Sequence, residues 1–181
     1  MKHNYSYSFK NVSIRPLSEN DIEFLRKWRN DDSNTKYLRK LPHITAEMQR
    51  SWFEKYLLNE DEICFAIDET EILNRIVGSL SLYEFKDNQA EFGKILIGDQ
   101  EAHGKSIGVN SITALMYIAF EKIGLDKVVL HVYTENKGAV HVYEKVGFSV
   151  VDVHVADNMD EYSMELSKEK FMKSMEDMCN A

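Results

Sequence analysis

A hydrophobic strand followed by a glycine-containing turn is the part of this sequence best suited to binding a phosphate group. The strand ends in Ile95, Leu96 and Ile97. The turn reads His103-Gly104-Lys105-Ser106-Ile107-Gly108, and apolar residues then recur at helical spacing. A turn that opens a helix presents free backbone N–H groups at the positive end of the helix dipole, which stabilises an anion. Because many such turns bind no ligand, this pattern alone is a weak indication of a phosphate site.

A second segment, residues 136–148, places a tyrosine within a regularly spaced motif. It reads N-K-G-A-V-H-V-Y-E-K-V-G-F, so that Tyr143 follows Asn136 by seven residues. Together the two segments resemble the GNAT N-acetyltransferases, whose N-x-x-A-x-x-x-Y-x-x-x-G-F signature this segment matches in full. The resemblance extends over residues 12–167 and is strongest over residues 91–148.

The resemblance implies that acetyl-CoA is the acetyl donor and that residues 103–108 hold its pyrophosphate. Further coenzyme contacts are implied in both segments, at Ile95, Leu96, Ile97, Asn136, Ala139 and Lys145. Two positions depart from the family's Q/R-x-x-G-x-G/A loop: His103 replaces Gln or Arg, and Ser106 replaces Gly. The Ser106 amide can still donate a hydrogen bond, so this change bears on how tightly the coenzyme binds rather than on whether it binds.

Acetyl transfer to an amine requires a base and an acid. Near neutral pH the amine is mostly ammonium and must lose a proton, and the departing thiolate must gain one. Tyr143 resembles the tyrosine that protonates the coenzyme sulfur in this family; the alternative is an aromatic ring packed in the core. For the base, Glu91 and His131 each resemble a position where some members hold one; the alternatives are an exposed strand carboxylate for Glu91 and a packed core residue for His131. We favour Glu91, and the two residues could share the work.

The N-terminal half is expected to shape the pocket for the acceptor amine. Residues 25–30 read L-R-K-W-R-N, and Trp52-Phe53 follows on the next helix. This pairing resembles the branch that holds ribosomal-protein N-terminal acetyltransferases and nucleotide-linked amino-sugar N-acetyltransferases. Four residues are the expected acceptor contacts: Trp28, Arg29, Asn30 and Tyr37. Trp28 and Trp52 also fit as core aromatics of two amphipathic helices.

Two acceptor classes therefore remain open, an amino sugar and a protein N-terminal amine, with polyamines and antibiotics ranked behind them. In both cases the amine attacks acetyl-CoA directly in a ternary complex. The rival interpretation is a non-catalytic coenzyme A-binding sensor or scaffold, and Ser106 is the feature that favours it.

The elements that position these residues alternate in an order that predicts a mixed α/β domain. Strands are expected at residues 12–15, 62–68, 75–85, 89–97, 127–133, 148–156 and 162–166. Helices are expected over residues 18–30, from Thr45 onward, over residues 108–124 and over residues 137–146. Short polar turns between strands predict a mostly antiparallel sheet of about seven strands flanked by helices, the GNAT fold. Residues 1–167 form this domain, and residues 168–181 form an amphipathic helix that docks on it or contacts a second copy.

The net charge, the cysteines and the lack of long apolar stretches exclude several classes of partner. The 181 residues carry a net charge of −8, which argues against a general nucleic-acid binder. Cys64 and Cys179 lack the spacing of metal ligands or of a disulfide framework, so we expect no metal and a reducing compartment. The sequence has no apolar stretch of membrane-spanning length, and residues 1–10 lack the apolar core of a signal peptide. We expect a cytoplasmic enzyme that acts on a small-molecule or peptide amine.

Overall fold

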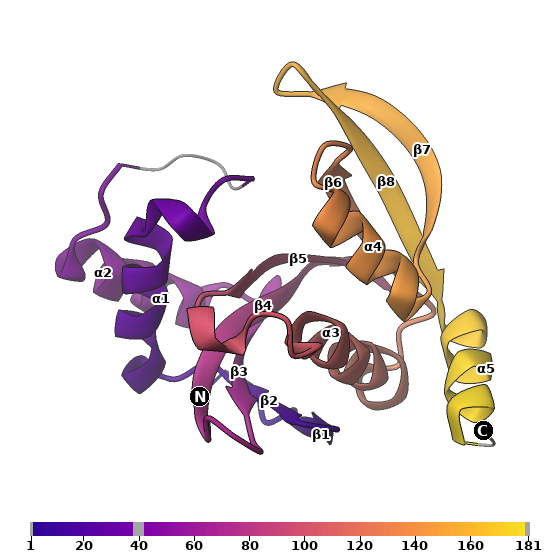
Figure 1. Ribbon diagram of the computed structural model, residues 1–181, viewed down its shortest axis with the longest axis horizontal. Coiled ribbons are helices and arrows are strands. Elements are labelled where there is room, and N and C mark those ends of the chain that lie inside the picture. Colours follow the sequence, from indigo (N-terminus) through magenta and orange to yellow (C-terminus); the bar gives the residue numbers. More distant parts are fainter. Residues whose placement is uncertain (1, 38–41, 180–181) are drawn as a thin grey trace.

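The computed structural model describes residues 2–37 and 42–179, and within them eight strands form one sheet (Figure 1). The strands are β1 Tyr7–Phe9, β2 Val12–Pro16, β3 Glu62–Glu69, β4 Arg75–Lys86, β5 Gln89–Ile97, β6 Lys127–Tyr133, β7 Ser149–Ala156 and β8 Met159–Ser167. Their order across the sheet is β1-β2-β3-β4-β5-β6-β8-β7. All neighbours are antiparallel except β5 and β6. The prediction of a mixed, mostly antiparallel sheet is confirmed.

The helices lie on both faces of this sheet. Those in the described residues are α1 Ile22–Asn30, α2 Ala46–Leu58, α3 Ile107–Tyr117, α4 Lys137–Val146 and α5 Lys168–Cys179. Both predicted caps are formed, although Ser18 caps the 3-10 turn Glu19–Asp21 and α1 begins only after it, at Ile22. The Ser18 amide donates to Asp21 Oδ2 at 2.8 Å in the short turn before α1, and Thr45 Oγ1 accepts from the Met48 amide at 3.2 Å.

The side chains of β3 explain why both faces are covered. Cys64 and Ala66 pack in a core with residues of α1 and α2, whereas Phe65 and Ile67 pack in the main core with α3. Successive side chains of a strand point to opposite faces of the sheet. All four of these side chains are buried, so both faces of the sheet are covered at β3. A nearly continuous apolar run therefore places α1 and α2 on one face and α3 on the other.

Two elements differ from the sequence prediction. The short strand β1 raises the number of strands from about seven to eight; its Tyr-Ser-Phe sequence is too short to show an alternating pattern, and its Tyr7 ring stacks on Tyr117 at 4.0 Å. The helix predicted over residues 108–124 changes character near its end. After Tyr117 it continues as a wider π-helical turn, Ile118–Ile123, which ends at Gly124 with a φ of 86°.

The pairing of β5 with β6 creates the break in the sheet that matters for function. The two strands pair in parallel from Gln89 and Lys127 to Glu91 and Val129, and there the pairing ends although both strands continue. On its other edge β5 carries a bulge at Lys94, which has a φ of 51°. Beyond Glu91, the backbone of β5 is therefore free on the side that faces β6.

The C-terminal segment is helical and contributes to the main core. Phe171 of α5 is only 1% exposed, and its ring lies 5.4 Å from that of Phe120. The end of the predicted tail, residues 180–181, lies outside the described residues. No helix in the described part of the chain is long and apolar enough to cross a membrane.

Candidate active site

Two left-handed residues shape the turn between β5 and α3. Gly104 has a φ of 75° and Ser106 a φ of 60°, and α3 begins at Ile107. The left-handed conformation explains why glycine suits position 106, since any Cβ is strained there. The first amides of α3 have no partner within the helix, so the turn offers donors to an anion.

The His103 side chain ties this turn back to the strand. Its Nε2 lies 2.9 Å from the carbonyl oxygen of Ile97, although the ring itself is exposed. The histidine thus fixes the position of the turn relative to the end of β5.

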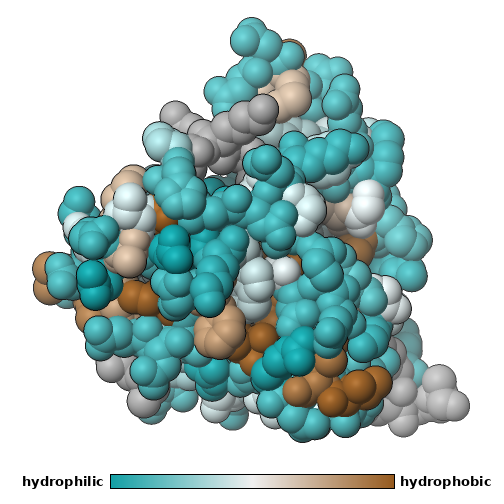
Figure 2. Space-filling view, turned by 60° about the vertical axis from the view of Figure 1, so that its left-hand side comes forward, coloured by the Kyte–Doolittle hydropathy of each residue, from teal (hydrophilic) through white to brown (hydrophobic). Residues whose placement is uncertain are grey.

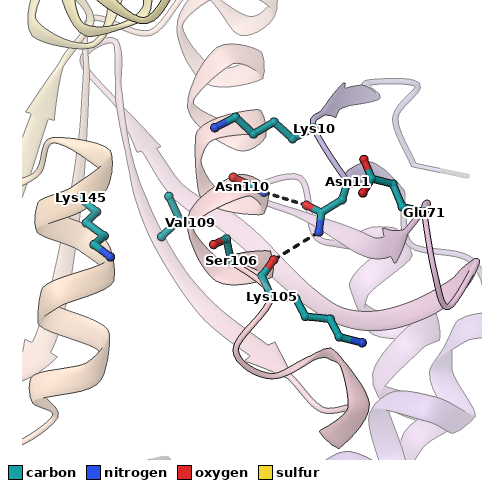
Figure 3. A pocket seen from close by; sticks show the side chains of 8 residues that line it. All are labelled: Lys10, Asn11, Glu71, Lys105, Ser106, Val109, Asn110 and Lys145. Carbon is teal, nitrogen blue, oxygen red and sulfur yellow. Dashed lines mark hydrogen bonds between the residues drawn. The ribbon is translucent and has the colours of Figure 1, made fainter.

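A basic pocket lies beside the turn (Figure 3). Its volume is about 410 Å³, and it is lined by Lys10, Asn11, Glu71, Lys105, Ser106, Val109, Asn110 and Lys145. Three lysines and one glutamate leave a formal charge of +2. The Asn110 amide donates to Asn11 Oδ1 at 2.7 Å, and the Asn11 amide donates to the Lys105 carbonyl at 3.2 Å, which joins α3 to the β1–β2 turn. Lys145 reaches toward the same space from α4, so the pocket suits phosphate groups.

Tyr143 lies in the apolar contact between α4 and β5. Asn136 caps α4, because its Oδ1 accepts from the Ala139 amide at 3.2 Å. The Tyr143 ring is 8% exposed and meets the rings of Phe92 and Phe148 edge-on, at 5.8 and 6.2 Å. Burial raises the pKa of its hydroxyl to about 12. Among the described residues that hydroxyl has no hydrogen-bond partner, so Tyr143 is a protonated donor available to a ligand.

Glu91 is part of a polar chain on the opposite face of the sheet. Its carboxylate accepts a hydrogen bond of 2.7 Å from the Tyr83 hydroxyl. The Lys94 ammonium lies 4.7 Å from the centre of the Tyr83 ring and 2.6 Å from Glu62 Oε1. These contacts connect the point where β5 and β6 separate to a cavity beneath α1 and α2.

His131 shares that face of the sheet but has other partners. It is exposed on β6, between the buried Leu130 and Val132, as the alternating pattern predicts. Its Nδ1 lies 3.1 Å from the Ser163 hydroxyl on β8, whereas Glu91 bonds to β4. The two candidate bases therefore do not form one hydrogen-bonded pair.

A cavity of about 540 Å³ lies between α1, α2 and the sheet. Its lining is mixed: Leu25, Arg29, Ile44, Met48, Gln49, Trp52, Glu62, Cys64, Ser79, Ser81, Lys94 and Leu96. The floor consists of small polar side chains, in which Ser81 donates to Cys64 Sγ at 3.1 Å. Figure 2 turns the α1 and α2 side forward; this face is mostly hydrophilic, with hydrophobic residues in small separate groups.

Arg29 is the charged group of this cavity that has no partner in the part of the chain that the structure describes. It follows Leu25 by four residues, so both side chains lie on the inward face of α1. Arg29 is half-buried, burial lowers the pKa of its guanidinium, and among the described residues it forms no hydrogen bond or ion pair. Glu62, by contrast, is buried and paired with Lys94. The cavity keeps a formal charge of +1.

The family model described as an acetyltransferase (GNAT) domain matches residues 11–149. The chain belongs to the GNAT acetyltransferase family. Among GNAT relatives, the spermidine N(1)-acetyltransferase of Escherichia coli (strain K12) is 28% identical over 145 residues, which cover 79% of this chain and 75% of that protein. Acetyltransferase PseH of Campylobacter jejuni is 23% identical over 136 residues, or 75% of this chain and 82% of that one.

The fold is shared with solved GNAT structures. The crystal structure of the spermidine N-acetyltransferase of Vibrio cholerae in complex with CoA and spermine superposes with a TM-score of 0.80 at 24% sequence identity. The match covers 90% of this chain and 98% of the chain in that structure. This GNAT protein is thus an acetyl-CoA-dependent N-acetyltransferase, as its motifs predict. The turn, the basic pocket and the free edge of β5 fit the coenzyme.

In this GNAT enzyme, only one of the four predicted acceptor residues lines the cavity. Arg29 does, whereas Trp28 packs on the backbone of Gly98, where an added Cβ would lie 2.1 Å from the indole Cγ. Asn30 uses its amide in two hydrogen bonds of 2.9 Å to the backbone of Ile44. Tyr37 has the Lys36 ammonium 4.9 Å above its ring. Trp28 and Asn30 thus hold the surrounding structure together, whereas the Tyr37 ring contacts its neighbour in the chain.

Sequence reasoning missed two charged residues that line this cavity, Glu62 and Lys94. Glu62 directly precedes the apolar run of β3, and Lys94 directly precedes that of β5. The charge of Glu62 at the start of a buried run was a signal, because a buried charge needs a partner, here Lys94.

Proposed function

We propose that this acetyltransferase acetylates the primary amine of a small molecule that also carries an anionic group. The observation that carries the proposal is Arg29, a half-buried guanidinium that lines the cavity and has no partner among residues 2–37 and 42–179. A buried charge favours an opposite charge on its ligand, and a guanidinium can bind phosphate or carboxylate with two parallel hydrogen bonds. A nucleotide-linked amino sugar, one of the two classes favoured by the L-x-x-W-R-N motif, has both required groups.

The residues supply the proton transfers. Acetyl-CoA contributes an activated thioester when bound. Glu91 accepts the proton of the acceptor ammonium, directly or through water, so that the free amine attacks the thioester carbonyl. The unpaired backbone of β5 beyond Glu91 offers an N–H group to the carbonyl oxygen. Tyr143 holds a proton for the departing coenzyme thiolate, because burial keeps its phenol neutral.

A polyamine is the second candidate acceptor. It is favoured by the spermidine N(1)-acetyltransferases among the relatives and by the buried carboxylate of Glu62. However, Lys94 already neutralises that carboxylate, at 2.6 Å, and Arg29 adds an unbalanced positive charge. A trivalent cation such as spermidine would meet a cavity of its own sign.

The test compares kcat/KM for a nucleotide-linked amino sugar, spermidine and a short peptide with a free N-terminus. We expect the amino sugar to be the best substrate. Arg29→Gln should lower its kcat/KM by about 10- to 100-fold and leave the rate with spermidine unchanged or higher. Spermidine as the best substrate, with no loss in Arg29→Gln for any acceptor, would exclude the anionic acceptor. Tight acetyl-CoA binding without turnover on any amine would support the non-catalytic alternative.

A further inference from the structure

Three side chains of the types that bind metal ions lie close together on β6, β8 and β7, the last three strands in the order of the sheet. His131 of β6, His154 of β7 and Glu161 of β8 each offer a ligand atom, and these atoms lie within 4.8 Å of one another. His154 Nε2 is 3.2 Å from Glu161 Oε2, and His131 Nδ1 is 4.0 Å from the same oxygen. Their contacts involve neither the acceptor cavity nor the basic pocket.

The strand register holds the three side chains on one face. His154 is directly opposite Glu161 in the β7–β8 pair, and His131 is directly opposite Ser163 in the β6–β8 pair. Glu161 and Ser163 are two residues apart on β8, so their side chains point to the same face. The convergence is therefore a property of the backbone pairing and does not depend on a single flexible loop.

Ser163 contacts both imidazole rings and orients that of His154. Its hydroxyl oxygen lies 3.1 Å from His131 Nδ1 and 3.5 Å from His154 Nδ1. For His154 this contact leaves Nε2, the nitrogen that faces Glu161, as the ligand atom. A hydrogen bond to the second ring nitrogen is the usual way in which proteins orient a metal-binding histidine.

We propose that His131, His154 and Glu161 bind one divalent transition-metal ion of the zinc type, with solvent at its remaining position. Bonds of about 2.0–2.2 Å place tetrahedral ligands roughly 3.3 Å apart, close to the separation already present between His154 and Glu161. To join the ion, His131 would rotate and exchange the contact of its Nδ1 with Ser163 for a bond to the metal. Two imidazoles and one carboxylate suit zinc, nickel or copper better than magnesium or calcium, which prefer oxygen ligands.

The site is open to ions from solvent, because the side chains are 37%, 39% and 16% exposed for His131, His154 and Glu161. A bound ion would join three strands, including β7, whose surface exposes Val151, Val153 and Val155. It would also occupy a nitrogen of His131 and so withhold that residue from proton transfer. The proposal is independent of the identity of the acceptor.

The test is isothermal titration of ZnCl₂ into chelator-treated, tag-free protein, with MgCl₂ as the control ion. We expect one zinc equivalent to bind and magnesium not to bind. Ser163→Ala should weaken zinc binding by about 10-fold, and His154→Ala by more than that. His141→Ala, which removes an exposed histidine on α4, should leave the isotherm unchanged. Because the His154 side chain is 39% exposed, its removal leaves no buried cavity, and circular dichroism checks the fold.

Cobalt(II) provides a second readout that identifies the ligands. Binding at this site should give ligand-field bands without the thiolate charge-transfer band expected of a cysteine site. The proposal is overturned if wild-type protein binds no zinc, if His154→Ala binds zinc as tightly as wild type, or if the cobalt spectrum shows a thiolate ligand.

Discussion

The Tyr83 hydroxyl donates a 2.7 Å hydrogen bond to the Glu91 carboxylate, from directly opposite positions on β4 and β5. Burial and the neighbouring carboxylate raise the pKa of Tyr83, so its phenol stays the donor and Glu91 the acceptor. Gly93 makes room for this contact, because a Cβ there would lie 2.4 Å from the Tyr83 oxygen. Glu91 is thus held at the last paired position before β5 and β6 separate.

Replacing the proposed base should make the reaction depend on the protonation of the acceptor itself. Glu91→Gln keeps the size and hydrogen bonding of the side chain but cannot take up a proton. Its kcat/KM should be lower by about 10²-fold near neutral pH and recover as pH approaches the pKa of the amine. His131→Gln should change little at any pH. A slow His131 variant beside an unaffected Glu91 variant would assign the base to β6.

Removing the Tyr143 hydroxyl should slow turnover and leave coenzyme binding intact. Tyr143→Phe preserves the ring contacts with Phe92 and Phe148, so kcat should fall by about 10²- to 10⁴-fold while acetyl-CoA affinity stays constant. Because burial raises the pKa of Tyr143 to about 12, the neutral donor is lost only as pH rises through that value. Wild-type kcat should therefore show no loss from Tyr143 ionisation up to about pH 10. Tyr117→Phe is the matched control, and single-turnover rates equal to wild type would reassign Tyr143 to packing.

Neutralising Lys145 should weaken acetyl-CoA binding through the basic pocket. Lys145→Gln is expected to raise the KM for acetyl-CoA by about 3- to 10-fold with little change in kcat, because an exposed lysine contributes modestly to a phosphate contact. Lys137→Gln lies on the same helix outside the pocket and should have no such effect. High salt should reduce the difference between wild type and Lys145→Gln. Equal KM values at low salt would contradict a phosphate contact from Lys145.

Relieving the strained conformation of Ser106 should stabilise the free protein. Ser106→Gly removes about 1–2 kcal/mol of left-handed strain and adds about 0.5–1 kcal/mol of chain entropy to the unfolded state. Urea unfolding should therefore show a small net gain, up to about 1.5 kcal/mol. Ser106→Val, with a branched Cβ, should lose more than about 1 kcal/mol. Equal stability of the two variants would mean that residue 106 is not left-handed in solution.

Sequence patterns predicted the parts of this protein that depend on local spacing. The helix over residues 137–146 that ends at Gly147, and the placement of His131 on the face opposite Leu130 and Val132, follow from local patterns. The family and the coenzyme were readable from the same short motifs.

Properties that depend on contacts between distant segments were not readable. Trp28 and Arg29 are adjacent, yet one packs on Gly98 and the other lines the acceptor cavity, and only the placement of α1 against the sheet separates them. Likewise, the grouping of His131 with His154 and Glu161 follows from the β6-β8-β7 strand order, which no local pattern reveals.

The contact between Trp28 and Gly98 limits how acceptor specificity can change in this scaffold. The indole leaves no room for even a methyl group on the backbone that connects β5 to the coenzyme turn. A mutation that shifts α1 would therefore disturb the binding of a donor that every acceptor shares. Met48, Gln49 and Trp52 line the cavity from another helix, α2, and Met48 is 48% exposed. Laboratory selection for a new acceptor should accordingly accumulate substitutions in α2 and spare Trp28, which sequencing of the selected variants would show.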